Sequence, residues 1–308
     1  MKVITNEYTG MGMKIAVLIM CHIDANRVNR LISALDNKDL DIYVHVDKKS
    51  NISSDISTDK RIRLLPDELR IDVRWAQFSQ VEAEINLIRY AYNFCEYDYY
   101  VLLSGYDYPI TSIVDFKRLL LENPKANYIG LTRSKNYLNN GRPNNFDKRN
   151  DIYYPKVILN QSVLSRILRR IWVELTGGYN RTYNIFKQSN HSSGFLYYYG
   201  SQWWCLTGST IEWMIGYLKE NQDFFYGFKG GCIPDESFFQ TLFMSSPYVD
   251  TRRDSLHYID WSEHNNNPKW LLLDDFESIK CSGKYFARKI ADEDLLDALD
   301  EYIRRKPL

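Results

Sequence analysis

The sequence has no long hydrophobic run, few cysteines and no excess of charge of either sign. Its 308 residues hold 39 Lys and Arg against 39 Asp and Glu, so the formal net charge is zero. Proteins that coat nucleic acid or bind polyanions over a broad surface carry a basic excess. We therefore expect no nucleic-acid partner, although local basic patches are compatible with this balance.

The five cysteines are odd in number, well separated and without a Cys-x-x-Cys pair. This distribution is typical of reduced, mostly buried thiols in the cytoplasm, and not of a disulfide framework. The apolar run from Ile15 to Met20 is too short for a signal peptide or a membrane span. We expect a cytoplasmic protein in which this run forms a buried strand.

Aromatic residues, in contrast, are abundant, with 24 Tyr, 14 Phe and 7 Trp. The flat apolar faces and polar edges of Tyr and Trp suit sugars and nucleotide bases, but large α/β cores also use many aromatic side chains. Both explanations stay open at this stage. For the adjacent pair Trp203 and Trp204, the alternation of side chains along a strand predicts that one of the two is buried.

Short apolar runs alternate with helical periodicity in the first half of the chain. Strands are expected at 14–20, 41–47 and 98–105, and helices at 25–35 and 79–94. In the second helix, Ser79 followed by Glu82 is the pattern of a capping box with Ser79 as N-cap. The succession predicts an α/β fold with a mainly parallel, doubly wound sheet, whose ligand crevice lies at the carboxyl ends of the strands.

Two expected strands end in polar residues. Asp47 ends one strand and is followed by lysines; a carboxylate there can bind a ribose or base, although a solvated turn explains this motif taken alone better. The segment LLSGYDYPI places Ser104 and Asp107 just beyond another strand. Both segments are candidates for the ligand crevice.

The sequence does not favour a metal site at these strand ends. Metal-dependent nucleotide-sugar enzymes place Asp-x-Asp there, because two carboxylates hold a divalent ion on the diphosphate. Here only Asp107 is acidic, the pair Asp39 and Asp41 precedes its strand, and the histidines lack ligand spacing. We expect no essential metal and no other cofactor.

Without a metal, fixed cations must stabilise a leaving diphosphate. The candidates form two groups near the C-terminal end of the chain, which are Arg252 with Arg253, and Lys284 with Arg288 and Lys289. Either group taken singly is better explained as a solvated basic face.

The segment GCIPDESFFQTL contains two adjacent acids between a Gly/Pro loop and an expected helix. Asp235 can cap that helix by accepting hydrogen bonds from its free amides. Glu236 would then lie in the first turn, where a carboxylate that faces the cleft can remove a proton from an acceptor hydroxyl. Capping accounts for one acid, so Glu236 is the candidate general base.

The middle of the chain is polar and basic apart from one amphipathic helix expected at 162–175. Arg166, Arg169 and Arg170 flank its apolar face. Such a helix can rest on a membrane that presents lipid-linked acceptors. The alternative that we favour here packs the apolar face on the core and leaves the arginines in solvent.

Seven motifs in order, from about Ile15 to Ile290, carry a resemblance to a known family. They are VHVDKKS, W-x-x-x-S-x-V from Trp75, LLSGYDYPI, GSQWWCLT, PDESFFQTL, LHYIDW and FARKI. The set resembles the core-2/I-branching glycosyltransferases, which include β-1,6-N-acetylglucosaminyltransferases and peptide xylosyltransferases. The resemblance implies a GT-A-like fold with a Rossmann-like nucleotide-binding half, a UDP-sugar donor, inversion at the anomeric carbon and no metal.

The resemblance also implies roles for individual residues. The family's general base falls on Glu236, its diphosphate-binding lysine on Lys289, and its nucleoside-binding aspartate on Asp47. A diphosphate-binding arginine upstream matches Arg252 or Arg253, and which of the two stays open. With the residues already singled out, the expected donor-binding set is Asp47, Ser104, Asp107, Arg252, Arg253, Arg288 and Lys289.

No repeat or Pro/Gly-rich linker divides the sequence, so we expect one domain over 1–308. Its parts are a nucleotide-sugar-binding half (13–131), a variable acceptor-side segment (132–200), and a catalytic and diphosphate-binding half (201–308).

We expect an inverting, metal-independent enzyme that moves N-acetylglucosamine from a UDP-sugar to a hydroxyl of a glycan or lipid-linked glycan. The place of action is bacterial surface-polysaccharide synthesis, in the cytoplasm or peripherally at the inner membrane. One alternative keeps the fold and changes the donor to UDP-xylose or another UDP-sugar. An alternative of another class is a non-catalytic protein that binds glycans or nucleotides.

Overall fold

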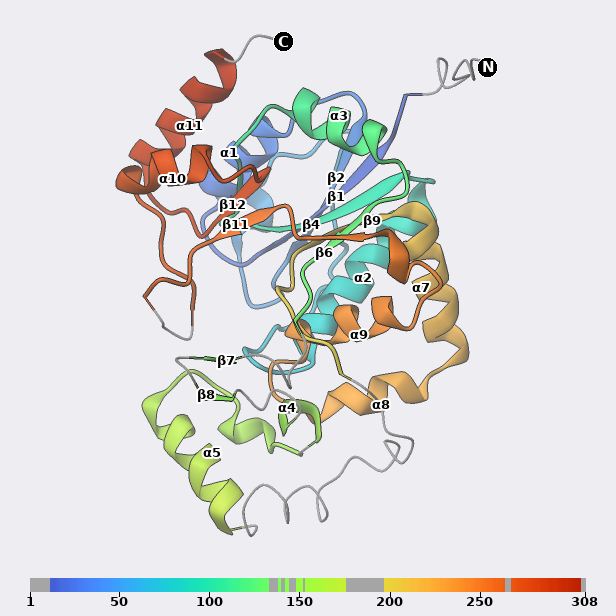
Figure 1. Ribbon diagram of the computed structural model, residues 1–308, viewed down its shortest axis with the longest axis vertical. Coiled ribbons are helices and arrows are strands. Elements are labelled where there is room, and N and C mark those ends of the chain that lie inside the picture. Colours follow the sequence, from blue (N-terminus) through green and yellow to red (C-terminus); the bar gives the residue numbers. More distant parts are fainter. Residues whose placement is uncertain are drawn as a thin grey trace.

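A computed structural model describes residues 12–132, 138–139, 142–143, 148–151, 153–175, 197–263 and 267–305. A seven-stranded sheet with the order β10-β6-β9-β4-β1-β2-β3 forms its centre (Figure 1). The strands of this sheet are β1 (Ile15–Cys21), β2 (Leu40–Val46), β3 (Ile62–Leu64), β4 (Tyr99–Ser104), β6 (Asn127–Ile129), β9 (Trp204–Thr207) and β10 (Arg252–Arg253). Neighbouring strands pair in parallel, except that β9 is antiparallel to both β4 and β6. The predicted mainly parallel α/β sheet is confirmed.

Helices cover both faces of the sheet. The α-helices are α1 (Ala25–Ala34), α2 (Ser79–Phe94), α3 (Ile113–Glu122), α4 (Lys148–Asp151), α5 (Val163–Leu175), α7 (Gly208–Glu220), α8 (Asp223–Lys229), α9 (Phe238–Met244), α10 (Phe276–Lys280) and α11 (Glu293–Arg305). Helices α1, α3 and α11 pack on one face, and α2, α7 and α9 on the other (Figure 1).

The double cover explains why the central strands are apolar throughout. In β1, Ile15, Val17 and Ile19 belong to the core under α1, while Ala16 and Leu18 belong to the core under α2. Every residue of β1 and β4 is buried. Strands that are buried on both faces lose the alternation of polar and apolar residues that marks a half-exposed strand.

Shorter elements accompany the central sheet and its helices in the described residues. A second sheet has the order β11-β12-β5 and a third joins β7 to β8. These strands are β5 (Tyr108–Pro109), β7 (Leu138–Asn139), β8 (Arg142–Pro143), β11 (His257–Ile259) and β12 (Phe286–Arg288). The 3-10 helices are η1 (Ile52–Asp55), η3 (Lys156–Ile158), η4 (Pro234–Glu236), η5 (Val249–Thr251) and η6 (Leu273–Asp275). Because β9 and β10 join a sheet that the first 131 residues begin, the two outer parts of the chain share one sheet.

Two local predictions are wrong. Ser79 is the first residue of α2 and not its N-cap, which is Phe78; the Ser79 hydroxyl instead accepts a hydrogen bond of 2.8 Å from the Arg74 amide. Trp203 and Trp204 are both buried, although only one was expected to be. Trp203 precedes the first residue of β9, so strand alternation does not relate the two rings, and both belong to the core that α2, α7 and α9 cover.

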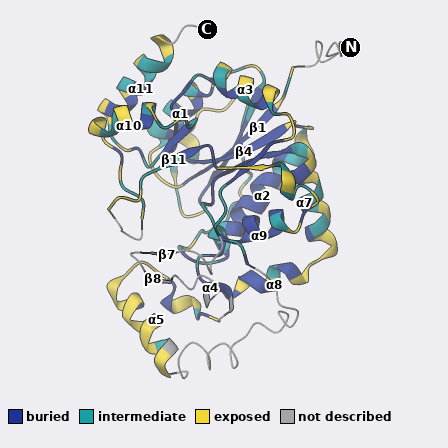
Figure 2. Cartoon of the chain, viewed as in Figure 1, coloured by how far each residue is buried: buried dark blue, intermediate teal, exposed yellow. Residues whose placement is uncertain are grey.

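Helix α5 also differs from the favoured expectation, because its apolar face points away from the core. Figure 2 shows α5 largely exposed at one end of the molecule. Ser165 is buried, so a polar position of the helix faces the rest of the chain. The exposed apolar side chains of α5 are Val163, Leu164, Ile167, Leu168, Ile171 and Leu175.

Candidate active site

A cavity of about 660 Å³ opens at the carboxyl ends of the central parallel strands. Cys21 and His22 at the end of β1, Asp47 after β2, and Ser104 with Gly105 at the end of β4 line it. The chain passes from β1 to β2 on one side and returns to β4 on the other, so β1 and β4 meet at the switch point of the sheet. Ligands of open α/β sheets bind at such a point.

Asp47 lies in this cavity as the sequence predicted, and it is held firmly. Its carboxylate accepts hydrogen bonds from the backbone amide of Lys49 at 3.0 Å and from the Lys49 ammonium at 2.9 Å. The same ammonium pairs with Asp72 at 2.8 Å. Two acids therefore share one lysine, and Asp47 keeps a fixed orientation at the rim of the crevice.

Ser104 lines the cavity, whereas Asp107 lies behind its wall. The buried Asp107 carboxylate accepts hydrogen bonds from the Ser104 hydroxyl at 2.7 Å and from Arg288 at 2.6 Å. Burial raises the pKa of Asp107, but the Arg288 charge and a contact with His257 outweigh it and leave the pKa below its usual value. The expectation that Asp107 contacts the donor is not supported by this placement, since the residue anchors Arg288 instead.

Arg288 and Lys289 bring two cations to the cavity at the end of β12. The Arg288 guanidinium lies 4.0 Å from the centre of the Trp203 ring, and the Lys289 ammonium lies 5.2 Å from that of Trp270. Burial and the neighbouring Arg288 lower the pKa of Lys289. Partly desolvated cations of this kind bind anions more strongly than cations in open water.

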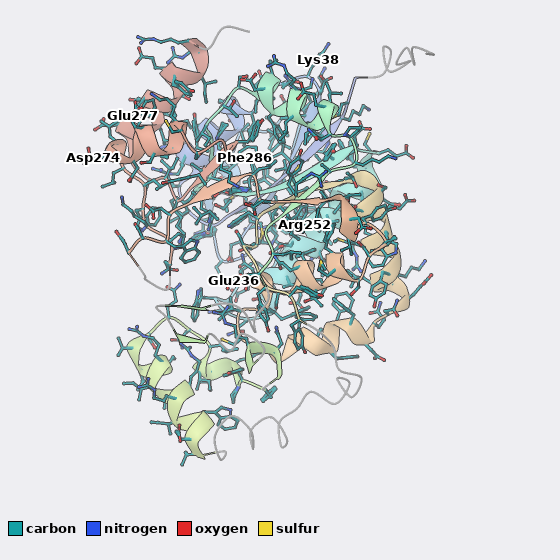
Figure 3. The ribbon with its side chains drawn as sticks, viewed as in Figure 1. Lys38, Glu236, Arg252, Asp274, Glu277 and Phe286 are labelled. Carbon is teal, nitrogen blue, oxygen red and sulfur yellow. The ribbon has the colours of Figure 1, made fainter. Side chains whose placement is uncertain are left out.

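The other predicted cations do not join them. Arg252 and Arg253 are exposed on the edge strand β10, and neither lines the cavity. Figure 3 shows Arg252 beside the sheet and Glu236 toward the end that carries α5. Lys284 binds the backbone carbonyl of Ser255 at 2.6 Å and also lies outside the lining. The structure thus brings one of the two candidate groups to the cleft, through Arg288 and Lys289.

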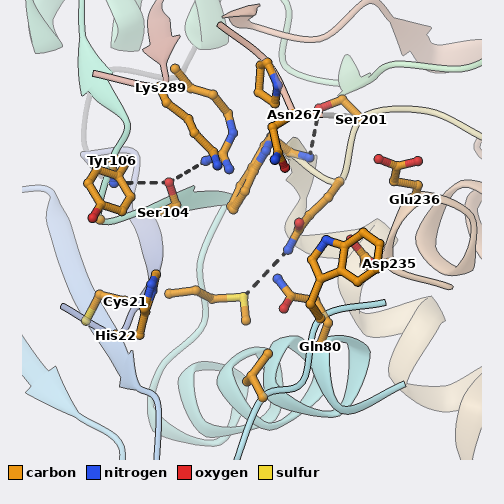
Figure 4. Close-up of a pocket in the computed structure, with 18 of the residues that line it drawn as sticks. Cys21, His22, Gln80, Ser104, Tyr106, Ser201, Asp235, Glu236, Asn267 and Lys289 are labelled. Carbon is orange, nitrogen blue, oxygen red and sulfur yellow. Dashed lines mark hydrogen bonds between the residues drawn. The ribbon is translucent and has the colours of Figure 1, made fainter. Parts of the chain in front are cut away.

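Glu236 lies on the opposite side of the cavity from Cys21 and His22 (Figure 4). Its Oε2 atom accepts a hydrogen bond of 2.6 Å from Nη1 of Arg149. No hydrogen bond to Oε1 occurs in the part of the chain that the structure describes. One oxygen is therefore fixed by a cation, and the other is available to a ligand.

Asp235 is not the predicted helix cap. The chain enters α9 through η4, and the N-cap of α9 is Ser237, without a side-chain hydrogen bond. Asp235 lines the cavity instead. Burial, and then the negative charge of Glu236, raise the pKa of Asp235 above its ordinary value.

Sequence reasoning missed several lining residues. His22 directly follows β1 and Tyr106 follows β4 after one residue, positions that could have singled them out. Gln202 lies within the motif GSQWWCLT, but only the neighbouring tryptophans of that motif were considered. The amide of Gln202 donates a hydrogen bond of 2.8 Å to Glu84, a fully buried carboxyl group on α2. The partner of the candidate base, Arg149, was missed as well, because it comes from the irregular middle segment.

Among the described residues, no three or more His, Cys, Asp or Glu side chains are arranged to hold a metal ion. Within the same residues, no helix is both long enough and apolar enough to cross a bilayer. All five cysteines are free, and three of them, Cys21, Cys205 and Cys232, are buried.

A family profile, curated proteins and a solved structure each match this chain. The profile of the Core-2/I-Branching enzyme family matches residues 15–280. Xylosyltransferase 1 of Homo sapiens is 23% identical to this chain, over 94% of this chain and 30% of the human protein. Xylosyltransferase 1 of Rattus norvegicus is also 23% identical, over 94% of this chain and 35% of the rat protein. This chain thus spans about a third of the curated relatives that it matches.

Among solved structures, apo mouse xyloside xylosyltransferase 1 superimposes with a TM-score of 0.38 at 11% identity, covering 89% of this chain and 97% of the mouse chain.

Proposed function

Because this chain belongs to the Core-2/I-Branching enzyme family, we propose that it is a glycosyltransferase that uses a UDP-sugar as donor and a glycan hydroxyl as acceptor. One observation carries the proposal. A carboxylate with a free oxygen, Glu236, and two adjacent cations, Arg288 and Lys289, line the same cavity at the switch point of the sheet.

In this proposal Glu236 acts as the general base. Its Oε1 removes the proton of the acceptor hydroxyl as the oxygen attacks the anomeric carbon, while Arg149 holds the other carboxylate oxygen in place. The bond from the anomeric carbon to the diphosphate oxygen breaks, and UDP leaves with the bonding electrons. Attack from the face opposite to UDP inverts the anomeric configuration.

The departing diphosphate needs a compensating charge. Lys289 and Arg288 supply it, and partial burial makes their attraction stronger than in water. In this proposal Asp47, which lines the same cavity, binds the nucleoside. With these cations in place the reaction proceeds without a metal, which is part of the proposal.

Two donors are candidates. N-acetylglucosamine is the sugar expected from the sequence resemblance, and xylose is favoured by the names of the curated relatives. Release of UDP, measured with a panel of UDP-sugars with and without EDTA, tests the proposal. Release with one donor in the presence of an acceptor and of EDTA supports it. Loss of activity in EDTA would refute the metal-free mechanism, and UDP binding without release from any donor would favour a non-catalytic binding protein.

The place of action is also proposed. We infer a cytoplasmic enzyme that rests peripherally on a membrane through α5 and serves the synthesis of bacterial surface polysaccharide on lipid-linked acceptors. The six apolar side chains exposed on α5, beside Arg166 and Arg170, support the membrane contact.

A further inference from the structure

A second cavity of about 370 Å³ adjoins the first. The two cavities share five lining residues, which are Trp75, Gln161, Asn267, Pro268 and Trp270. They therefore form one continuous cleft, with the candidate donor site at the strand ends and an extension that reaches α5. A molecule that occupies the extension lies against the cavity that holds Glu236.

Two tryptophans form walls common to both cavities. Trp75 is partly exposed, and 45% of the surface of Trp270 is exposed. Trp270 also contacts Tyr106 edge-on, with ring centres 5.0 Å apart. Partly exposed tryptophan rings present broad apolar faces with a polar edge, which suits the faces of sugar rings.

Two arginines of α5 also line the extension. Arg169 is fixed, because its Nη1 donates hydrogen bonds to the carbonyls of Ile158 at 2.7 Å and Asn160 at 3.0 Å. Its guanidinium lies 5.6 Å from the centre of the Trp75 ring. The Arg166 side chain is exposed and, among the described residues, makes no hydrogen bond or ion pair.

The described residues give the extension a positive charge. Its charged lining residues in the part of the chain that the structure describes are Arg166, Arg169 and Glu263, whose formal charges sum to +1. A free guanidinium presents a planar fork of N–H donors that fits a carboxylate with two parallel hydrogen bonds. A neutral sugar cannot make this charge-assisted pair.

We propose that the extension is an acceptor subsite that recognises an acidic sugar unit, with the carboxylate of a uronic acid on Arg166 and its ring between Trp75 and Trp270. This inference rests on the proposed function, since it assigns the acceptor side of the same cleft. It makes Arg166 a specificity-determining residue, and leaves donor binding to the cavity at the strand ends.

The test compares cellobiuronic acid with cellobiose, two disaccharides that differ by one carboxylate, by isothermal titration with and without UDP. In the wild-type protein the acid binds about tenfold more tightly, the ratio expected for one charge-assisted hydrogen-bonded pair. Arg166→Gln removes this preference and leaves the affinity for cellobiose unchanged. Arg170→Gln, a matched control on an exposed neighbour outside the cavity lining, keeps it.

Equal binding of the two disaccharides to the wild-type protein, or no binding of either, overturns the inference. A preference for the acid that persists in Arg166→Gln also overturns the inference. The same holds if Arg170→Gln removes the preference to the same extent as Arg166→Gln. UDP titrated alone reports on the proposed function separately. Failure of UDP to bind contradicts the donor site, whereas the disaccharide ratio measured without UDP does not depend on it.

Discussion

Nη1 of Arg149 lies 2.6 Å from Oε2 of Glu236, across 87 positions of sequence. The pair ties the irregular middle of the chain to the candidate base. A hydrogen bond from a cation fixes the direction of a carboxylate and leaves its second oxygen free for a substrate proton. The segment that was expected to face the acceptor thus also positions the residue proposed to activate it.

Replacing the candidate base should separate binding from turnover. Glu236→Gln keeps the shape of the side chain but removes its basicity, so we expect glycosyl transfer to fall by about a hundredfold or more. Affinity for UDP, measured by titration, should stay within about twofold of the wild-type value because the substitution leaves the cation at Lys289 in place. If the Glu236→Gln variant transferred the sugar at a near-normal rate, Glu236 would not be the general base.

Arg149 should behave as a positioning residue. In Arg149→Gln the Glu236 carboxylate loses its charged partner, and we expect kcat to fall by about tenfold with little change in the KM of the donor. Arg149→Lys retains a cation within reach and should recover part of kcat. An equal loss in both variants, accompanied by a lower melting temperature, would indicate a structural role only.

The two candidate cation groups give a matched comparison. Lys289→Met removes a cation from the cavity wall, whereas Arg253→Met removes one from the exposed strand β10. We expect about tenfold weaker UDP binding for Lys289→Met and no change for Arg253→Met, since solvent screens a charge outside the cavity. If Arg253→Met weakened UDP binding by the same factor, the diphosphate site would lie at β10 instead.

Glu84 should make the stability of the protein depend on pH. Burial, and then the charge of Asp235, raise the pKa of Glu84 well above its ordinary value of 4.5. The folded protein keeps this proton above that pH and the unfolded chain releases it, so the contribution of Glu84 to stability is lost as pH rises toward the folded pKa.

The neutral variant Glu84→Gln can still accept the hydrogen bond from Gln202 but has no proton to lose. We expect its free energy of unfolding to exceed that of the wild-type protein by about 1 kcal/mol or more at alkaline pH. The difference should vanish near the ordinary pKa of the carboxyl group. Urea unfolding at both pH values measures it, and a difference independent of pH would contradict the linkage.

Exposed apolar residues of α5 should govern membrane binding. Leu164 is 64% exposed and Ile167 is 51% exposed. Replacing both by Ser should lower binding to anionic vesicles by about tenfold or more in a flotation assay, given the free energy of burying two such side chains. Leu121→Ser, at a site on α3 that is 60% exposed, is the control and should bind normally. No binding by the wild-type protein would end the membrane proposal.

The sequence by itself determined the class of fold and the place of the cleft. Buried runs such as Ile15–Cys21 form strands because apolar side chains on both faces must be covered by helices. Asp47 and Ser104 line the cavity because parallel strands bring their carboxyl ends to one edge of the sheet. Local patterns carry this information, since each depends only on neighbouring residues.

Tertiary structure alone decided which charged groups meet. Asp107 lies behind the wall with Arg288, and Arg253 lies on the far edge strand. The apolar face of α5 points outward although its periodicity is that of a packed helix. Periodicity identifies the apolar side of an element, but what covers that side depends on where segments distant in sequence come to lie. The position of Arg149 beside Glu236 depends on the same long-range arrangement.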